Sequence, residues 1–149
     1  MPGDWEGAVR GGYVQHGETY LNDAEELWWS KGGELVGTSP ERIAFLRGII
    51  RESPTGVLDP LDSDWDAPRG GVRGEYELIY FGFNRPRFRN VTLPTSGRFA
   101  IDVIDTWAMT VQRVAESASA GLRVELPGRP HMAIRLTRLG PVPADQVTV

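Results

Sequence analysis

The sequence contains no cysteine and only two histidines, His16 and His131. Without thiols the chain has no disulfide, no thiolate zinc site and no cysteine nucleophile. Two imidazoles are too few to suggest a structural metal site by themselves. We therefore expect neither a metal nor a cofactor.

Long apolar runs are also lacking. The sequence has no stretch of about 20 apolar residues, the length needed to span a bilayer. Met1–Glu6 has neither the basic nor the apolar region of a secretory signal. These absences predict a cytoplasmic chain without membrane contact. The arginines are spread along apparent strands and form no clustered basic block, so the pattern does not predict a nucleic-acid partner.

With 149 residues and 40% hydrophobic content, the chain suits one modest domain, or one small domain with an appendage. Residues 4–10 are predicted to form a short helix that stops at Gly11-Gly12. Residues 13–16 are typical of one short strand, and residues 17–23 of a polar loop that follows it.

The clearest helix signal begins at Ser39. This residue offers an N-cap oxygen, Pro40 suits the first helical position, and Glu41 favours the positive end of the helix dipole. An apolar stripe at helical spacing follows and ends before Pro54; it comprises Ile43, Phe45, Leu46, Ile49 and Ile50.

Residues 54–73 are rich in Pro, Gly and Asp, and we predict an irregular linker there. After Gly74 the apolar period changes to two, which is typical of strands. The predicted strands cover residues 75–80, 99–104, 109–112, 122–126 and 132–137, with turns between them. We therefore predict a mainly β fold, an antiparallel β-sandwich of five to seven strands preceded by a short strand and one or two helices.

Three segments in the first half carry a resemblance to a known family: residues 11–20, 27–33 and 39–47. They resemble the last strand, loop and helix of the TIM barrel in bacterial glycoside hydrolases related to apiosidase-like enzymes. Residues 80–82 and 103–110 resemble the small all-β carboxy-terminal domain of that family. The resemblance implies a barrel remnant over residues 1–53, a linker over 54–73 and an all-β domain over 74–149.

The same resemblance argues against catalysis by this chain alone. A barrel of this kind has eight strands over about 250 residues, and its active site is built from the loops of several strands. This chain matches only the last strand. Glycoside hydrolysis needs two carboxyl groups about 5 to 10 Å apart, and the resemblance puts them on strands that find no match here. We therefore predict no catalytic residue in the chain.

The resemblance places His16, Glu18 and Tyr20 at the catalytic mouth of the barrel, where they either line the substrate site or order its loops. Trp28 and Trp29 either stack on a sugar ring or pack against the terminal helix and an interface, and we favour packing. If they are exposed, the apolar patch predicts self-association, so a homodimer or the missing barrel portion is an expected partner.

Three further groups of polar residues have both a ligand-binding and a structural interpretation. Asp59, Asp62, Asp64 and Asp66, with Trp65, are interpreted as a solvated linker and not as a cation site, because they lack the glycine and terminal glutamate of an EF-hand. Residues 105–107 are predicted to form a hairpin turn fixed by Asp and Thr side chains. Arg85, Arg87 and Arg89 share one strand face and are expected to pair with Glu75, Glu77 or the acidic linker.

The sequence is compatible with two alternative functions. The first is the carboxy-terminal portion of a glycoside hydrolase that acts on carbohydrate, with an accessory β-sandwich. The alternative is a stand-alone β-sandwich module that binds a glycan or another protein.

Overall fold

The computed structural model describes residues 2–12, 19–21, 23, 33–94 and 97–140. The described helices are α1 (Pro2–Val9) and α2 (Ser39–Arg51). The described strands are β1 (Thr19–Leu21), β2 (Glu34–Val36), β3 (Asp59–Asp64), β4 (Ala67–Val72), β5 (Tyr76–Tyr80), β6 (Phe88–Val91), β7 (Arg98–Asp105), β8 (Thr110–Ala118), β9 (Leu122–Glu125) and β10 (Met132–Gly140).

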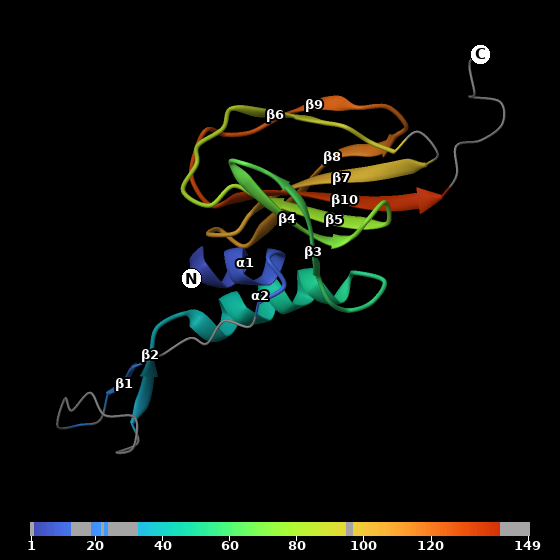
Figure 1. Cartoon of the computed structure of the whole chain (residues 1–149). Coiled ribbons are helices and arrows are strands. Elements are labelled where there is room, and N and C mark those ends of the chain that lie inside the picture. The colour runs from blue at the N-terminus through green and yellow to red at the C-terminus, as the bar shows by residue number, and fades with distance from the viewer. Residues whose placement is uncertain (1, 13–18, 22, 24–32, 95–96, 141–149) are drawn as a thin grey trace, which may run out of the picture.

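Three layers make up the main body of the molecule. The middle layer is an antiparallel six-stranded sheet in the order β3-β4-β5-β10-β7-β8. The two-stranded sheet β6-β9 covers one face and completes a β-sandwich, while α1 and α2 cover the other face (Figure 1). The antiparallel hairpin β1-β2 lies beyond the amino-terminal end of α2, away from the sheet (Figure 1). The prediction of a mainly β sandwich is confirmed.

The central strands β5, β7 and β10 are buried on both faces because they have a covering layer on each side. Alternate side chains point to opposite faces of a strand, so β10 supplies Met132, Ile134 and Leu136 to the core beneath β6-β9. Its Ala133 belongs to the core beneath the helices. The near-continuous apolar character of these strands follows from this double burial.

The helical layer packs tightly on the sheet. Trp5 and Val9 of α1 and Leu46 and Ile49 of α2 are buried in one cluster with residues of β5. Burying a large apolar side chain contributes about 1.5–3 kcal/mol. The helices are therefore held to the sheet by a core of their own.

The predicted boundaries of α2 are nearly right. Thr38, not Ser39, is the N-cap residue, and it makes no side-chain capping bond. Ser39 is already helical and is buried. Pro40 and Glu41 lie in the first turn as expected, since Pro lacks the N–H that would have no partner there.

The prediction that residues 54–73 form an irregular linker is wrong, because β3 and β4 occupy most of that segment. In the main sheet β3 pairs with β4, and β4 pairs with β5. The glycines that suggested a linker have a packing role. A Cβ on Gly70 would lie 2.3 Å from the carbonyl oxygen of Val9 in α1, so only glycine allows this helix to approach the strand.

Among the described residues from 74 onward the structure has six strands, within the predicted five to seven. Of these, β6 was foreseen only as a strand face that carries Arg85, Arg87 and Arg89, and it contains Arg89 alone of the three. The short helix at residues 4–10 corresponds to α1, but β1 lies inside the predicted loop 17–23. The predicted strand at residues 13–16 lies outside the described residues. The division into a barrel remnant and a β domain stays a prediction.

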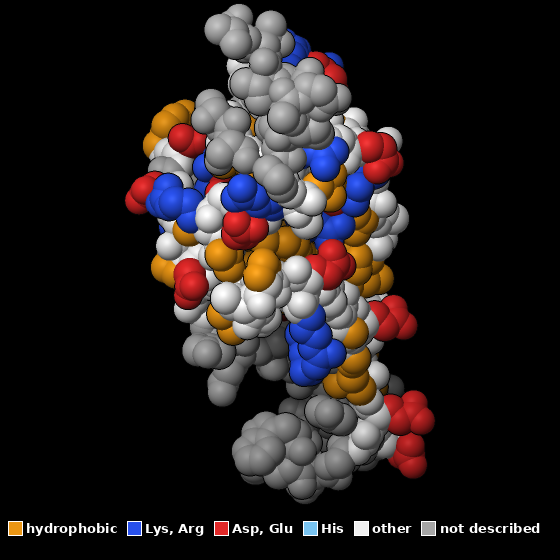
Figure 2. Space-filling model, turned by 90° about the vertical axis from the view of Figure 1, so that its right-hand side faces the viewer, with side chains coloured by type: hydrophobic (Ala, Val, Ile, Leu, Met, Phe, Trp, Pro, Cys, Tyr) orange, Lys and Arg blue, Asp and Glu red, His pale blue; other side chains and the backbone are white. Residues whose placement is uncertain are grey.

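The described surface carries interspersed charges. Figure 2 shows arginine and acidic side chains side by side on one face, with small apolar areas between them. Exposed pairs such as Arg73–Asp62, with a nitrogen–oxygen distance of 2.7 Å, contribute at most about 1 kcal/mol each. Neither described helix has the length and hydropathy of a membrane span.

Candidate functional site

The structure leaves most of the sequence-predicted site residues undescribed. His16, Glu18, Trp28 and Trp29 lie outside the described residues. Tyr20 belongs to β1, where its backbone pairs with Leu35 of β2. Their assignment to a substrate wall therefore stays a prediction. Among the described residues, the candidate site lies elsewhere in the fold.

That place is the turn between β3 and β4. Asp64 pairs with Ala67 across the hairpin, so Trp65 and Asp66 are the two turn residues. The Trp65 side chain is 98% exposed, which is unusual for a residue type that is buried on average. A fully exposed indole offers an apolar ring face and one N–H donor to a ligand.

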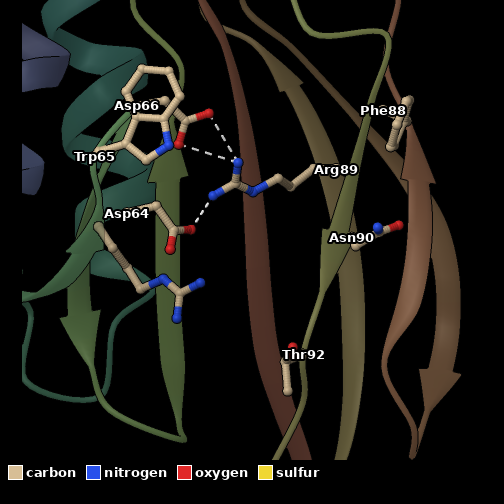
Figure 3. A pocket seen from close by; sticks show the side chains of 8 residues that line it. Asp64, Trp65, Asp66, Phe88, Arg89, Asn90 and Thr92 are labelled. Atoms are coloured by element: carbon tan, nitrogen blue, oxygen red, sulfur yellow. Dashed lines mark hydrogen bonds and ion pairs between the residues drawn. The ribbon is translucent and has the colours of Figure 1, made fainter.

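Arg89 of β6 fixes the acidic residues on either side of Trp65. Its guanidinium donates to both oxygens of Asp66, at 3.0 and 3.2 Å, and also to Asp64. The guanidinium lies 6.0 Å from the centre of the Phe81 ring, close enough for a cation–π contact. Figure 3 shows Arg89 reaching across from β6 to the two carboxylates beside the indole. The turn is thus tied to the small sheet by charge-assisted hydrogen bonds.

Between the turn and β6 lies an open cleft of about 560 Å³, which we name the Trp65 cleft. Its lining is polar apart from two aromatic residues: Asp64, Trp65, Asp66, Arg69, Phe88, Arg89, Asn90 and Thr92. In the described sheets β6 has only β9 as a neighbour, so the backbone of β6 keeps one edge outside that ladder. The cleft therefore combines a ring face with carboxylate, guanidinium and backbone groups.

The side chains of Phe88 and Asn90 point to the opposite side of β6 from Arg89 (Figure 3). There Arg123 of β9 stacks on Phe88, with its guanidinium carbon 3.6 Å from the ring centre. Arg123 also pairs with Glu125 at 2.6 Å. The Phe88 ring therefore packs against β9. Of the two aromatic residues that line the cleft, Trp65 is the one whose ring is exposed to a ligand.

The predicted turn at residues 105–107 is confirmed. One carboxylate oxygen of Asp105 accepts hydrogen bonds from the backbone N–H groups of Trp107, at 2.9 Å, and Ala108, at 2.7 Å. The hydroxyl of Thr106 donates to the carbonyl of His131 at 2.8 Å. This turn connects β7 to β8, as the interrupted alternation indicated.

The acidic residues of the predicted linker pair with arginines. Asp62 pairs with Arg73, and Asp64 and Asp66 pair with Arg89. Within the described ranges no group of three or more His, Asp or Glu side chains is arranged to hold a metal ion. The interpretation as a solvated linker was wrong for Asp64 and Asp66, which belong to the Trp65 cleft.

The expected pairing of the strand arginines is right only in part. Arg89 pairs with the acidic segment, as considered from the sequence, whereas Arg85 and Arg87 precede β6 and lie in the connection from β5. Glu75 and Glu77 pair instead with Arg138 and Arg69. The sequence analysis missed the cleft, and the signal that could have indicated it is an Asp-Trp-Asp segment together with an arginine distant in the sequence.

Comparison with known proteins adds two findings. Residues 65–137 match a family described as domain of unknown function DUF5605. A crystal structure from Bacteroides vulgatus, described as that of a putative glycoside hydrolase, is similar with a TM-score of 0.70 and 30% sequence identity. The similarity covers 91% of this chain but only 30% of that protein, so the chain spans less than a third of its length. No curated protein is a significant match.

Proposed function

We propose that this chain is the accessory, non-catalytic portion of a carbohydrate-acting protein and that it contacts glycan through the Trp65 cleft. The observation that carries the proposal is the structural similarity to a protein described as a glycoside hydrolase, at 30% identity over 91% of this chain. The unmatched 70% or so of that protein has room for a complete TIM barrel, which needs about 250 residues. The resemblance of residues 1–53 to a last barrel strand and helix agrees with this division.

The surroundings of the described carboxylates support a non-catalytic role. Glycoside hydrolysis needs two carboxyl groups that face the sugar about 5 to 10 Å apart. The buried Asp102 pairs with Arg135 and Arg113, and the buried Asp105 pairs with Arg129. Asp64 and Asp66 share Arg89. These four carboxylates form ion pairs that hold elements of the fold together.

The composition of the Trp65 cleft supports carbohydrate as the ligand class. A sugar presents an apolar C–H face to an aromatic ring and a rim of hydroxyl groups to polar side chains. The exposed indole of Trp65 provides the ring, while Asp64, Asp66 and Arg89 provide acceptors and donors around it. The ion pairs hold these polar groups in place before a ligand arrives, which lowers the entropic cost of binding.

The catalytic half of the proposal is tested by incubating the purified chain with a panel of aryl glycosides. We expect no release of the aryl group above the buffer control. Turnover that is abolished by Glu18→Gln would overturn the proposal, because it would place a working catalytic carboxylate in this chain. The DNA immediately upstream provides a second check, since the proposal expects it to encode barrel strands in some reading frame.

A further inference from the structure

A second group of exposed rings lies at the end of the sandwich that carries the β5–β6, β7–β8 and β9–β10 connections, which we name the loop end (Figure 1). Phe83 is 77% exposed and Trp107 is 57% exposed. His131 lies between them, with its ring centre 5.1 Å from that of Phe83 and 6.1 Å from that of Trp107. Three connections thus contribute one ring each to a single row.

The row is continuous with the Trp65 cleft. Trp65 and Phe83 line the same hollow of about 310 Å³, whose lining also includes Asp64, Asp66 and Asn84. The amide of Asn84 donates to the backbone carbonyl of Asp66 at 2.7 Å and so joins the two regions. Trp107 and His131 line the next hollow, of about 340 Å³. The order along the surface is therefore Trp65, Phe83, His131, Trp107.

The loop end is held by backbone bonds that converge on His131. Its N–H donates to the carbonyl of Gly82 at 2.7 Å, and its carbonyl accepts from the backbone N–H of Thr106 at 3.1 Å. His131 has a φ of 62°, and Met109 in the neighbouring turn has a φ of 56°. Such conformations are costly for residues other than glycine and are often found where a structure holds a ligand site.

Polar groups accompany the rings. The hydroxyl of Tyr80 lies within hydrogen-bond distance of Nδ1 of His131, at 3.2 Å, and burial raises the pKa of Tyr80 to about 12, so this phenol keeps its proton. Asp105 and Arg129, 2.5 Å apart, line the hollow beside Trp107. Arg42 of α2 covers one side of the Trp107 ring, at 4.4 Å from its centre.

We propose that Trp65, Phe83, His131 and Trp107 form one extended binding surface for a carbohydrate chain, with Trp65 at one end and Trp107 at the other. This inference rests on the proposed function, because it takes the same ligand class. Polar or charged groups lie beside the rings along the row, namely Asn84 next to Phe83, the Tyr80 hydroxyl at His131 and the Asp105–Arg129 pair next to Trp107. A glycan alternates ring faces with hydroxyl groups and matches this arrangement, whereas a protein interface has a continuous apolar centre.

The surface predicts that affinity depends on glycan length. A short fragment contacts Trp65 alone, and a longer fragment also reaches Phe83 and Trp107. Removal of a well-placed aromatic contact commonly weakens binding about tenfold or more. We therefore expect Phe83→Ala and Trp107→Ala to weaken the binding of long fragments about tenfold and to leave the binding of short fragments unchanged, while Trp65→Ala weakens both.

The experiment uses the full chain in two steps. Native gels containing soluble xylan, arabinan, galactan or β-glucan identify the polysaccharide that retards the protein. Fragments of graded length from that polysaccharide are then titrated calorimetrically. Trp107→Phe keeps a ring and should retain most of the affinity. Leu139→Ala is the matched control, because Leu139 is 47% exposed and lines neither hollow.

The outcomes separate this inference from the proposed function. If the protein is retarded and Trp65→Ala abolishes retardation, but affinity is independent of fragment length and of Phe83 and Trp107, the extended surface is wrong and the Trp65 cleft stands. If no polysaccharide retards the wild-type protein, the glycan contact at Trp65 fails as well. If the protein dimerises and Phe83→Ala or Trp107→Ala restores the monomer without changing retardation, the loop end is a protein contact and the inference is overturned.

Discussion

Asp102 in β7 provides the sharpest test of how the core is held together. Its carboxylate is 1% exposed and accepts hydrogen bonds from Nε of Arg135, at 2.9 Å, and from Nε of Arg113, at 2.5 Å. Arg135 in β10 also pairs with Glu52, next to α2, and its side chain is 8% exposed. The network therefore links two central strands to the helical layer.

Replacing Asp102 by Asn removes the negative charge between two arginines and leaves Arg135 without its buried counter-charge, so that only the half-exposed Glu52 still pairs with it. Breaking a buried ion pair in this way costs about 3–5 kcal/mol. At about 3 °C per kcal/mol for a chain of this size, the melting temperature should fall by about 10–15 °C. Arg113 is 38% exposed, so Arg113→Ala should cost only about 1 kcal/mol.

Urea unfolding followed by far-ultraviolet circular dichroism measures the free energy of unfolding of each variant. The double variant Asp102→Asn/Arg135→Met should be more stable than Asp102→Asn alone, because it no longer contains a buried cation that has lost its buried counter-charge. A loss below about 1 kcal/mol in Asp102→Asn, or an equal loss in Arg113→Ala, would refute the reasoning that Arg135 depends on a buried counter-charge.

Three further predictions concern other parts of the fold. Burial lowers the pKa of His131, so the unfolded chain binds a proton more readily and stability should fall as the pH decreases below about 6.5; His131→Asn, which tolerates the positive φ, should weaken this dependence in urea titrations. Gly70→Ala forces a Cβ against Val9 of α1 and should cost about 1–3 kcal/mol, whereas Gly48→Ala on open helix surface should stabilise the protein by about 0.5–1 kcal/mol; equal effects in thermal melts would argue against the close approach. Asp105→Ala removes the oxygen that accepts hydrogen bonds from two backbone N–H groups and should cost about 1–3 kcal/mol. Asp105→Asn keeps an oxygen acceptor and should cost less.

The parts of the fold that the sequence predicted well are those with a local signal. The alternation through β5, β7 and β10 and the apolar stripe of α2 depend on spacing within one element. The strands β3 and β4 were missed because their Pro and Gly residues are those expected of a loop. Gly70 is explained only by Val9, which lies in another element.

The Trp65 cleft was missed for a related reason. Its central ring belongs to a two-residue turn, and its organising cation, Arg89, is 25 positions away from Asp64 in the sequence. Composition made the acidic turn resemble a solvated linker. Only the packing of β6-β9 on the main sheet brings Arg89 to the turn, so a tertiary contact was needed to recognise the site.

In our proposal this sandwich contacts carbohydrate through the exposed ring of Trp65. The most direct test of this contact compares the mobility of the wild-type chain and of Trp65→Ala in native gels with and without soluble polysaccharide. Because Trp65 is 98% exposed, the substitution should leave the melting temperature unchanged. We expect at least one polysaccharide to retard the wild-type chain and Trp65→Ala to lose this retardation; equal mobility of the two proteins in every polysaccharide would contradict the proposed contact.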